Sequence, residues 1–105
     1  MPVQITPGEL RARLASDAPP VVLDVREPQE LAIARLAGAL EIPMNDVPSR
    51  LDDLPREAEI VVVCHHGMRS AHVAGFLADR GYRVLNLAGG IDAWSLQVDP
   101  TVPRY

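Results

Sequence analysis

The feature that most restricts the fold is a run of four apolar residues, Ile60–Val63, followed directly by Cys64. Such a run is typical of a β-strand, and the earlier run Val21–Val25 is apolar enough to be covered on both faces of a sheet. A helical pattern follows from about Arg69 to Arg80. A strand, a short glycine-containing loop and a helix in this order direct backbone N–H groups toward one anionic atom. The sequence therefore predicts an α/β fold with Cys64 in its reactive loop.

Strands and helices alternate along the rest of the chain. The patterns predict strands at 3–5, 21–25, 40–42 and 84–87, and helices at 7–15, 28–35, 47–51 and around Trp94. Such alternation indicates a parallel sheet between two helical layers, with right-handed crossovers. In these sheets the ligand site lies beyond the carboxyl ends of the strands, where Cys64 falls. We expect a single domain, 1–105, with an irregular tail at 98–105 that contains two prolines.

Composition excludes several classes of partner. The formal net charge of −4 provides no general attraction to nucleic acid or to an anionic membrane. No apolar stretch approaches the roughly 20 residues of a membrane span. We expect a monomer, because no feature of the sequence demands a larger assembly. The single cysteine cannot form an internal disulfide. Because no basic segment followed by an apolar block begins the chain, we expect it in the reducing cytoplasm.

The position of Cys64 suits a nucleophile. Only the thiolate form of a cysteine reacts, and free cysteine is ionised to a few per cent at neutral pH. A helix N-terminus stabilises an anion by about 0.3–1 kcal/mol, and by up to about 2 in favourable geometry. Direct hydrogen bonds from loop amides, and the guanidinium of Arg69 if it turns inward, favour the thiolate further. The alternative is that Cys64 is a small buried hydrophobic residue.

Three stretches carry a more specific signal. They are Leu23–Pro28 with Glu30, then Cys64-His65-His66-Gly67-Met68-Arg69-Ser70, then Leu87–Trp94. In this order they resemble the opening signature, the catalytic loop and the closing Gly-Gly and Ala-Trp signature of single-domain rhodaneses, the persulfide-forming sulfurtransferases. One stretch departs from that family. Where it usually has Gly-His-Ile-Pro-Gly-Ala, this chain has Ala34–Ala39, with Arg35 in place of the histidine.

The resemblance implies a three-layer α/β/α fold with a five-stranded parallel sheet whose fourth strand is central. It also implies an enzyme without a cofactor. This enzyme would move a sulfane sulfur from thiosulfate or a persulfide donor to cyanide, a small thiol or a protein cysteine. The sulfur would be carried as a persulfide of Cys64.

Two other functions stay open. Cysteine phosphatases and arsenate reductases of this fold resemble Cys-x5-Arg, whereas four residues separate Cys64 from Arg69 here. The tighter loop should fit a sulfur atom and exclude a tetrahedral oxyanion, which makes this function the less favoured one. A non-catalytic binding module is the other alternative, although such modules often lack the cysteine that this chain keeps.

The first half of the loop offers candidate binding residues. His65 and His66 either line the entrance, where they donate hydrogen bonds or carry positive charge toward an incoming anion, or are exposed without a role. We expect no metal there, because adjacent histidines in a tight loop rarely converge on one ion. Gly67 provides a backbone conformation or a close approach that a side chain would hinder. Met68 either walls the pocket with apolar surface or only packs.

The second half of the loop and one earlier pair complete the candidate site. Arg69 either shapes the site from the first helical turn or is a solvated helix residue. Ser70 either donates a hydrogen bond to the thiolate or caps a free N–H. Asp24 and Arg26 are interpreted as structural anchors that bind loops at the edge of the sheet, with no part in the chemistry.

Overall fold

The computed structural model describes residues 3–105 and contains one parallel sheet of five strands in the order β1-β5-β4-β2-β3. The strands are β1 (Gln4–Ile5), β2 (Val21–Asp24), β3 (Leu40–Glu41), β4 (Ile60–Val63) and β5 (Val84–Leu87). The helices are α1 (Pro7–Leu14), α2 (Pro28–Ile33), α3 (Met68–Ala78) and α4 (Gly90–Gln97), with a 3₁₀ segment η1 (Met44–Asp53). The expected five-stranded sheet with β4 at its centre is confirmed.

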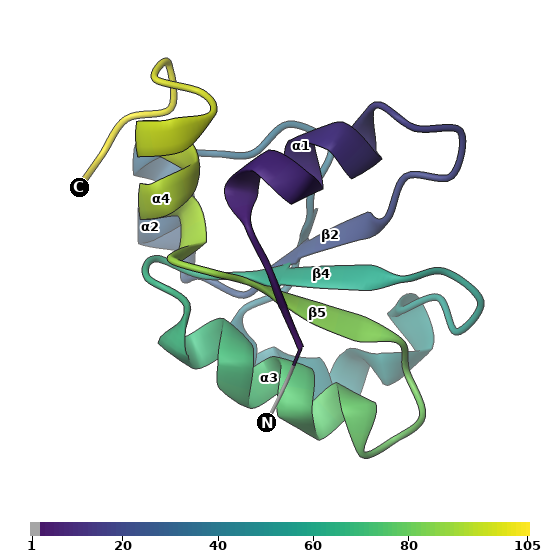
Figure 1. Cartoon of the computed structure of the whole chain (residues 1–105). Helices are drawn as coiled ribbons and strands as arrows, with labels where there is room; N and C mark the ends of the chain where they lie inside the picture. The colour runs from purple at the N-terminus through teal and green to yellow at the C-terminus, as the bar shows by residue number, and fades with distance from the viewer. Residues whose placement is uncertain (1–2) are drawn as a thin grey trace.

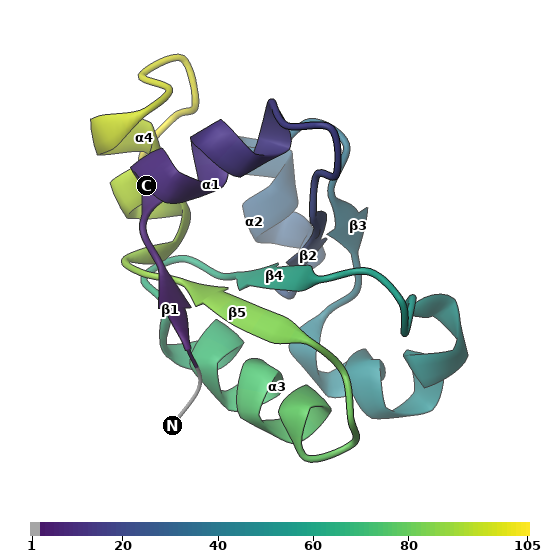
Figure 2. The same cartoon turned by 45° about the vertical axis from the view of Figure 1, so that its right-hand side comes forward.

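Two helical layers enclose the sheet (Figures 1 and 2). Helices α1, α2 and α4 cover one face, and α3 with η1 covers the other. The α3 layer packs on a buried cluster that includes Ile60, Val62 and Leu77, and the α1/α4 layer packs on a second cluster that includes Val61 and Val63. Alternate residues of β4 therefore serve opposite faces, as the two-residue repeat of a strand requires. The central strand is therefore covered on both sides.

Local signals define the helix starts accurately. Helix α1 begins with a capping box in which the hydroxyl of Thr6 accepts from the N–H of Glu9 and the carboxylate of Glu9 accepts from the N–H of Thr6. Helix α2 begins with a second capping box, formed by Glu27 and Glu30, directly before Pro28 as the first helical residue. Helix starts are better predicted than helix ends because the caps are local interactions.

The region between β3 and β4 differs from the prediction. We expected a short α-helix at 47–51, but the chain forms the longer 3₁₀ segment η1. Pro48 lies inside this segment and donates no backbone hydrogen bond, and Arg50 has non-helical backbone angles. Tighter 3₁₀ turns tolerate such interruptions in short pieces.

A buried ion pair joins the end of β2 to its surroundings. Asp24 and Arg26 are both fully buried, and the guanidinium of Arg26 donates from Nε at 2.9 Å and from Nη2 at 2.7 Å to the Asp24 carboxylate. Arg26 also donates to the carbonyl of Ala34 at 2.7 Å, just after α2. Burial opposes the charge on Arg26, but the hydrogen bonds with Asp24 and with the hydroxyl of Tyr105 outweigh it and raise the pKa of Arg26.

The chain after α4 has neither helix nor strand and folds back along α4 (Figure 1). Val102 is buried in the cluster beneath α1 and α4, and its carbonyl accepts from the hydroxyl of Ser95 at 2.6 Å. Arg104 pairs with Asp92 of α4 at 2.9 Å. These contacts hold the tail against the domain and bring Tyr105 to the carboxyl edge of the sheet.

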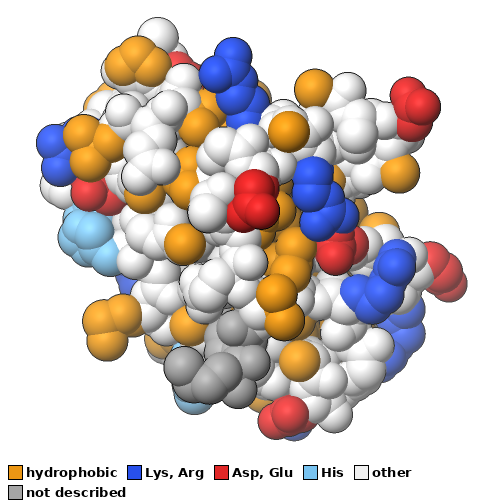
Figure 3. All heavy atoms as spheres, in the orientation of Figure 1, with side chains coloured by type: hydrophobic (Ala, Val, Ile, Leu, Met, Phe, Trp, Pro, Cys, Tyr) orange, Lys and Arg blue, Asp and Glu red, His pale blue; other side chains and the backbone are white. Residues whose placement is uncertain are grey.

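The surface carries charges of both signs. On the face shown in Figure 3, acidic and basic side chains are interspersed with apolar ones, in line with the small net charge. Within residues 3–105, no helix is both long enough and apolar enough to cross a membrane.

Replacing Arg26 by Met should lower the free energy of unfolding by about 3–5 kcal/mol, because it leaves the buried Asp24 carboxylate without its counter-ion. Urea denaturation measures this change. The matched control is Arg35→Met, which removes a pair with Glu41 in which the Arg35 side chain is 64% exposed. This control should cost less than about 1 kcal/mol. Equal losses in the two variants would contradict the structural role of the buried pair.

Candidate active site

Cys64 lies at the carboxyl end of the central strand, directly before the loop that leads into α3. It continues the alternation of Ile60 and Val62, so its side chain faces the α3 layer. The residue is 1% exposed, and its Sγ atom accepts from the N–H of Gly67 at 3.1 Å. The hydroxyl of Ser70 lies 3.3 Å from the same sulfur. Among the described residues, one backbone amide and one hydroxyl are thus within hydrogen-bond distance of Sγ. The sequence analysis expected hydrogen bonds from several loop amides.

The close approach of α4 shapes the loop. The N–H of Ile91 donates to the carbonyl of Cys64 at 2.8 Å, and the N–H of Asp92 donates to the carbonyl of His65 at 3.1 Å. Gly90, with φ +62°, lies so close to these two carbonyls that a Cβ atom there would overlap them. The Gly-Gly pair at the start of α4 therefore lets the loop backbone lie directly on the helix N-terminus.

Gly67 has φ +105°, a conformation that residues with a side chain rarely adopt. A Cβ atom on Gly67 would also lie 3.3 Å from the N–H nitrogen of Gly89 and 3.4 Å from the carbonyl of Leu87. This glycine directs its own N–H toward Cys64, and both the turn and the lack of space require it.

Asn86 of β5 is a polar residue of the site that the sequence analysis did not identify. Its side-chain nitrogen donates to the carbonyl of Gly67 and to the side chain of Gln4, both at 3.1 Å, and its oxygen accepts from the hydroxyl of Ser70. Ser70 and Asn86 are both buried. The sequence pattern that could have identified Asn86 is a single amide side chain inside an otherwise apolar strand.

Arg69 turns toward α2. Its guanidinium donates to both carboxylate oxygens of Glu30, at 2.7 and 2.8 Å. The hydroxyl of Tyr105 donates to Glu30 at 2.8 Å. The hydrogen bond from Arg69 lowers the pKa of Glu30 to about 2, and the same bond raises the pKa of Arg69. Arg69 is therefore a paired cation that bridges the loop and α2, and Glu30 joins the site as its partner.

Three aromatic rings stack over the outer side of the loop. His65 lies between His66, at a centroid distance of 3.9 Å, and Tyr105, at 4.0 Å. Burial is the main reason why the pKa of Tyr105 is raised. The Nε2 atom of His65 is buried and has no hydrogen-bond partner within residues 3–105. Met68, by contrast, is 84% exposed and so presents its side chain to solvent beside the loop.

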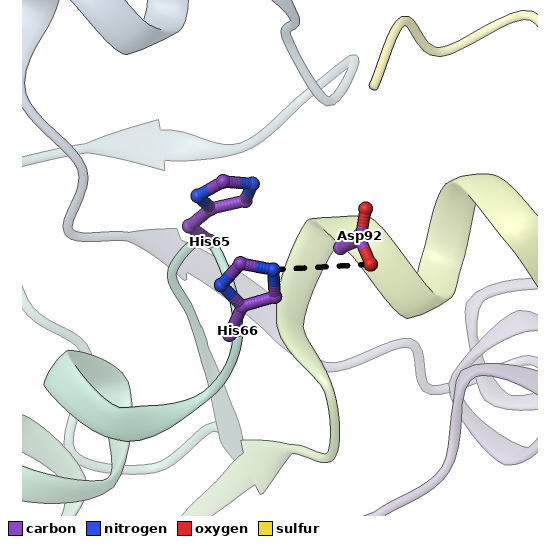
Figure 4. A group of neighbouring side chains, drawn as sticks. All are labelled: His65, His66 and Asp92. Carbon is purple, nitrogen blue, oxygen red and sulfur yellow. Dashed lines mark ion pairs between the residues drawn. The ribbon is translucent and has the colours of Figure 1, made fainter. Parts of the chain in front are cut away.

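His65, His66 and Asp92 form a cluster of potential metal ligands (Figure 4), with one ligand atom of each within 4.8 Å of the others. His66 Nε2 lies 3.9 Å from the Asp92 carboxylate. The two imidazole planes are inclined by only 24° and stacked. Each lone pair lies in its own ring plane, so the rings do not point at one ion. The Asp92 carboxylate also accepts a hydrogen bond from Arg104, so it is already paired with a cation.

Replacing Glu30 by Gln should lower the free energy of unfolding by about 1–2 kcal/mol at pH 7, because Arg69 loses a charged partner. The pKa of Glu30 is depressed to about 2 in the folded chain. Its contribution is therefore complete above the usual value of 4.5 and is lost as the pH falls toward 2. Urea denaturation at pH 7, 4 and 2.5 should show the gap between wild type and variant closing in acid. A constant gap would argue against this ion pair.

Comparisons with known proteins agree with this geometry. A family model described as "Rhodanese-like domain" matches residues 6–97. A sulfurtransferase from Allochromatium vinosum is 37% identical over 100 residues, which are 94% of each chain. The thiosulfate sulfurtransferase GlpE from Pseudomonas entomophila is 32% identical over 92 residues, covering 87% of this chain and 83% of the relative.

Solved structures show the same relationship. The crystal structure of a rhodanese-like domain protein from Staphylococcus aureus superposes with a TM-score of 0.86 at 31% identity, over 98% of both chains. The match of the family model covers most of the chain, and the relatives match it almost from end to end. The chain therefore belongs to the rhodanese-like domain family.

Proposed function

We propose that this chain is a rhodanese-type sulfurtransferase in which Cys64 carries the transferred sulfur. The observation that supports this most directly is the buried Sγ of Cys64 beside the N–H of Gly67 and the hydroxyl of Ser70. A thiol that serves only as a small core residue has no need of polar neighbours. Hydrogen bonds to sulfur favour its charged form, which is the nucleophile. The names of the relatives support the same class of reaction.

The proposed reaction has two displacement steps. The Cys64 thiolate attacks the outer sulfur of thiosulfate or of a persulfide. A new S–S bond forms, the S–S bond of the donor breaks, and sulfite or a thiolate leaves with the electron pair. A thiophilic acceptor, such as cyanide, a small thiol or a protein cysteine, then attacks the outer sulfur and restores the Cys64 thiolate. No step needs a cofactor or an external oxidant.

The charges around the loop favour a donor of low charge. Each nearby arginine already has a carboxylate partner, in the pairs Arg26–Asp24, Arg69–Glu30 and Arg104–Asp92. A dianion such as thiosulfate therefore meets little uncompensated positive charge at this edge of the sheet. We propose that the persulfide of a thiol or of a protein is the natural donor, and that the donor works in the reducing cytoplasm.

The Arg69–Glu30 pair gives no support to phosphatase activity. An arginine binds phosphate and carboxylate oxygens in the same bidentate way, and here both terminal nitrogens of Arg69 already bind Glu30. A phosphate would have to displace a bidentate carboxylate before it could bind.

The decisive experiment is intact-protein mass spectrometry after incubation with thiosulfate or with a small-thiol persulfide. Wild type should gain the mass of one sulfur atom, and cyanide should remove it. Cys64→Ser should gain none, and because Cys64 is the only cysteine, no other thiol can mask the result. A folded wild type that takes sulfur from neither donor would favour a non-catalytic module.

Thiosulfate should be the poorer donor of the two. Sulfur loading by thiosulfate should saturate only at millimolar concentrations or above, because the arginines beside the loop within residues 3–105 are already paired with carboxylates. Stopped loading reactions at graded donor concentrations measure this. Saturation far below a millimolar would remove the support for a persulfide donor while leaving sulfur transfer itself intact.

A further inference from the structure

Asn86 lies outside the loop yet contacts two of the groups that surround the Cys64 sulfur. It is 2% exposed, and its neighbours in β5 are apolar. A buried amide is stable only where its hydrogen-bonding groups are paired. One end of this amide binds the carbonyl of Gly67, whose own N–H donates to Sγ, and the other end binds Ser70.

The partners determine which way the amide points. The carbonyl of Gly67 can only accept, so the atom that faces it at 3.1 Å must be the Asn86 nitrogen. The Asn86 oxygen then faces Ser70 and can only accept, so the hydroxyl of Ser70 donates its single proton to Asn86. That proton is not available to the sulfur of Cys64 in this arrangement.

Two proton arrangements follow, one for each state of the sulfur. In the thiol state, the S–H group of Cys64 donates to the Ser70 oxygen, and Ser70 donates to Asn86. When the thiol loses its proton to solvent, the sulfur can only accept. The Ser70 hydroxyl can then rotate its proton to Sγ at 3.3 Å, which breaks its hydrogen bond to Asn86. Sulfur and amide thus compete for one proton.

We propose that Asn86 is a positioning residue that controls the Ser70 proton: it accepts this proton while Cys64 is a thiol and gives it up when the sulfur becomes an anion. The same amide holds the Gly67 carbonyl, and so keeps the Gly67 N–H aimed at Sγ. This role rests on the proposed sulfur transfer, because it sets how much thiolate is available to attack a donor.

Other ionisable groups face the loop and also act on the thiolate. From α2, α3, α4, the loop and the tail these are Glu30, Arg69, Asp92, His65, His66, Arg104 and Tyr105. Substitutions at positions 70 and 86 change none of them. These groups act on the Cys64 thiolate in the same way in every variant described below. Their effect therefore cancels when the consequence of Ser70→Ala is compared between wild type and Asn86→Val.

The test is a double-mutant cycle read by the rate of iodoacetamide alkylation of Cys64 as a function of pH. Ser70→Ala should move the midpoint of this curve to higher pH, because a donor to the sulfur is lost. The shift should be small in wild type, where Asn86 competes for the proton. In the Asn86→Val background, the shift of the midpoint caused by Ser70→Ala should be larger by about one pH unit. This is equivalent to a tenfold change in the fraction of thiolate. Loosening of the loop by Asn86→Val affects both members of that pair and cancels.

The control is Gln4→Ala, which removes the remaining partner of the Asn86 nitrogen and should leave the midpoint unchanged. Equal Ser70→Ala shifts in the two backgrounds, or a larger shift with Asn86 present, would overturn the proposal. Alkylation needs no sulfur donor, so its outcome is separate from that of sulfur loading. The Ser70→Ala shift could be larger in the Asn86→Val background in a chain that never takes up sulfur. That result would support the competition between Asn86 and Cys64 for the Ser70 proton and contradict the sulfurtransferase function.

A second measurement avoids Asn86 variants that fail to fold. The chain has a single cysteine, so its infrared spectrum at low pH contains one S–H stretching band. In wild type the S–H group should donate to Ser70, which lowers the frequency of this band. Ser70→Ala should return the band to the frequency of a free thiol. An unchanged band would show that the thiol does not donate to Ser70 and would overturn the proposed arrangement.

Discussion

The structure depends on the burial of β4 on both faces. Ile60 and Val62 pack against the α3 layer while Val61 and Val63 pack against the α1/α4 layer, so one strand belongs to both hydrophobic clusters. Its end is equally constrained, because the carbonyls of Cys64 and His65 bind the first N–H groups of α4. A strand held in this way leaves its following loop little freedom, and the Cys64 sulfur faces the first turn of α3 as a result.

The polar groups around the sulfur are paired with one another more completely than the sequence implied. Three arginines near the loop each bind a carboxylate, and the Ser70 hydroxyl binds an amide. Hydrogen-bonded and ion-paired side chains are held in place by their partners. The consequence is a site with fixed dipoles and little uncompensated charge among the described residues.

Local patterns in the sequence predicted most of the backbone. The starts of α1 and α2 and the alternation of strand and helix follow from interactions between residues close in the chain. Gly90, by contrast, is required by its close approach to the carbonyls of Cys64 and His65, which belong to a distant segment. The 3₁₀ segment η1 was predicted less well, because Pro48 and Arg50 disturb a short helix in ways that a propensity pattern does not capture. The loop that follows Cys64 could be identified because its residues are consecutive.

The sequence by itself determined the fold class, the position of Cys64 at the end of a central strand, and the family to which the loop belongs. It did so because burial patterns and loop motifs act over a few residues. Only the tertiary structure decided the partners of the side chains. Glu30 accepts hydrogen bonds from Arg69, which is 39 residues away in the sequence, and from Tyr105, which is 75 residues away. Asn86 accepts one from Ser70, which is 16 residues away. Such pairings depend on how distant segments are brought together at one edge of the sheet, and no local pattern encodes that.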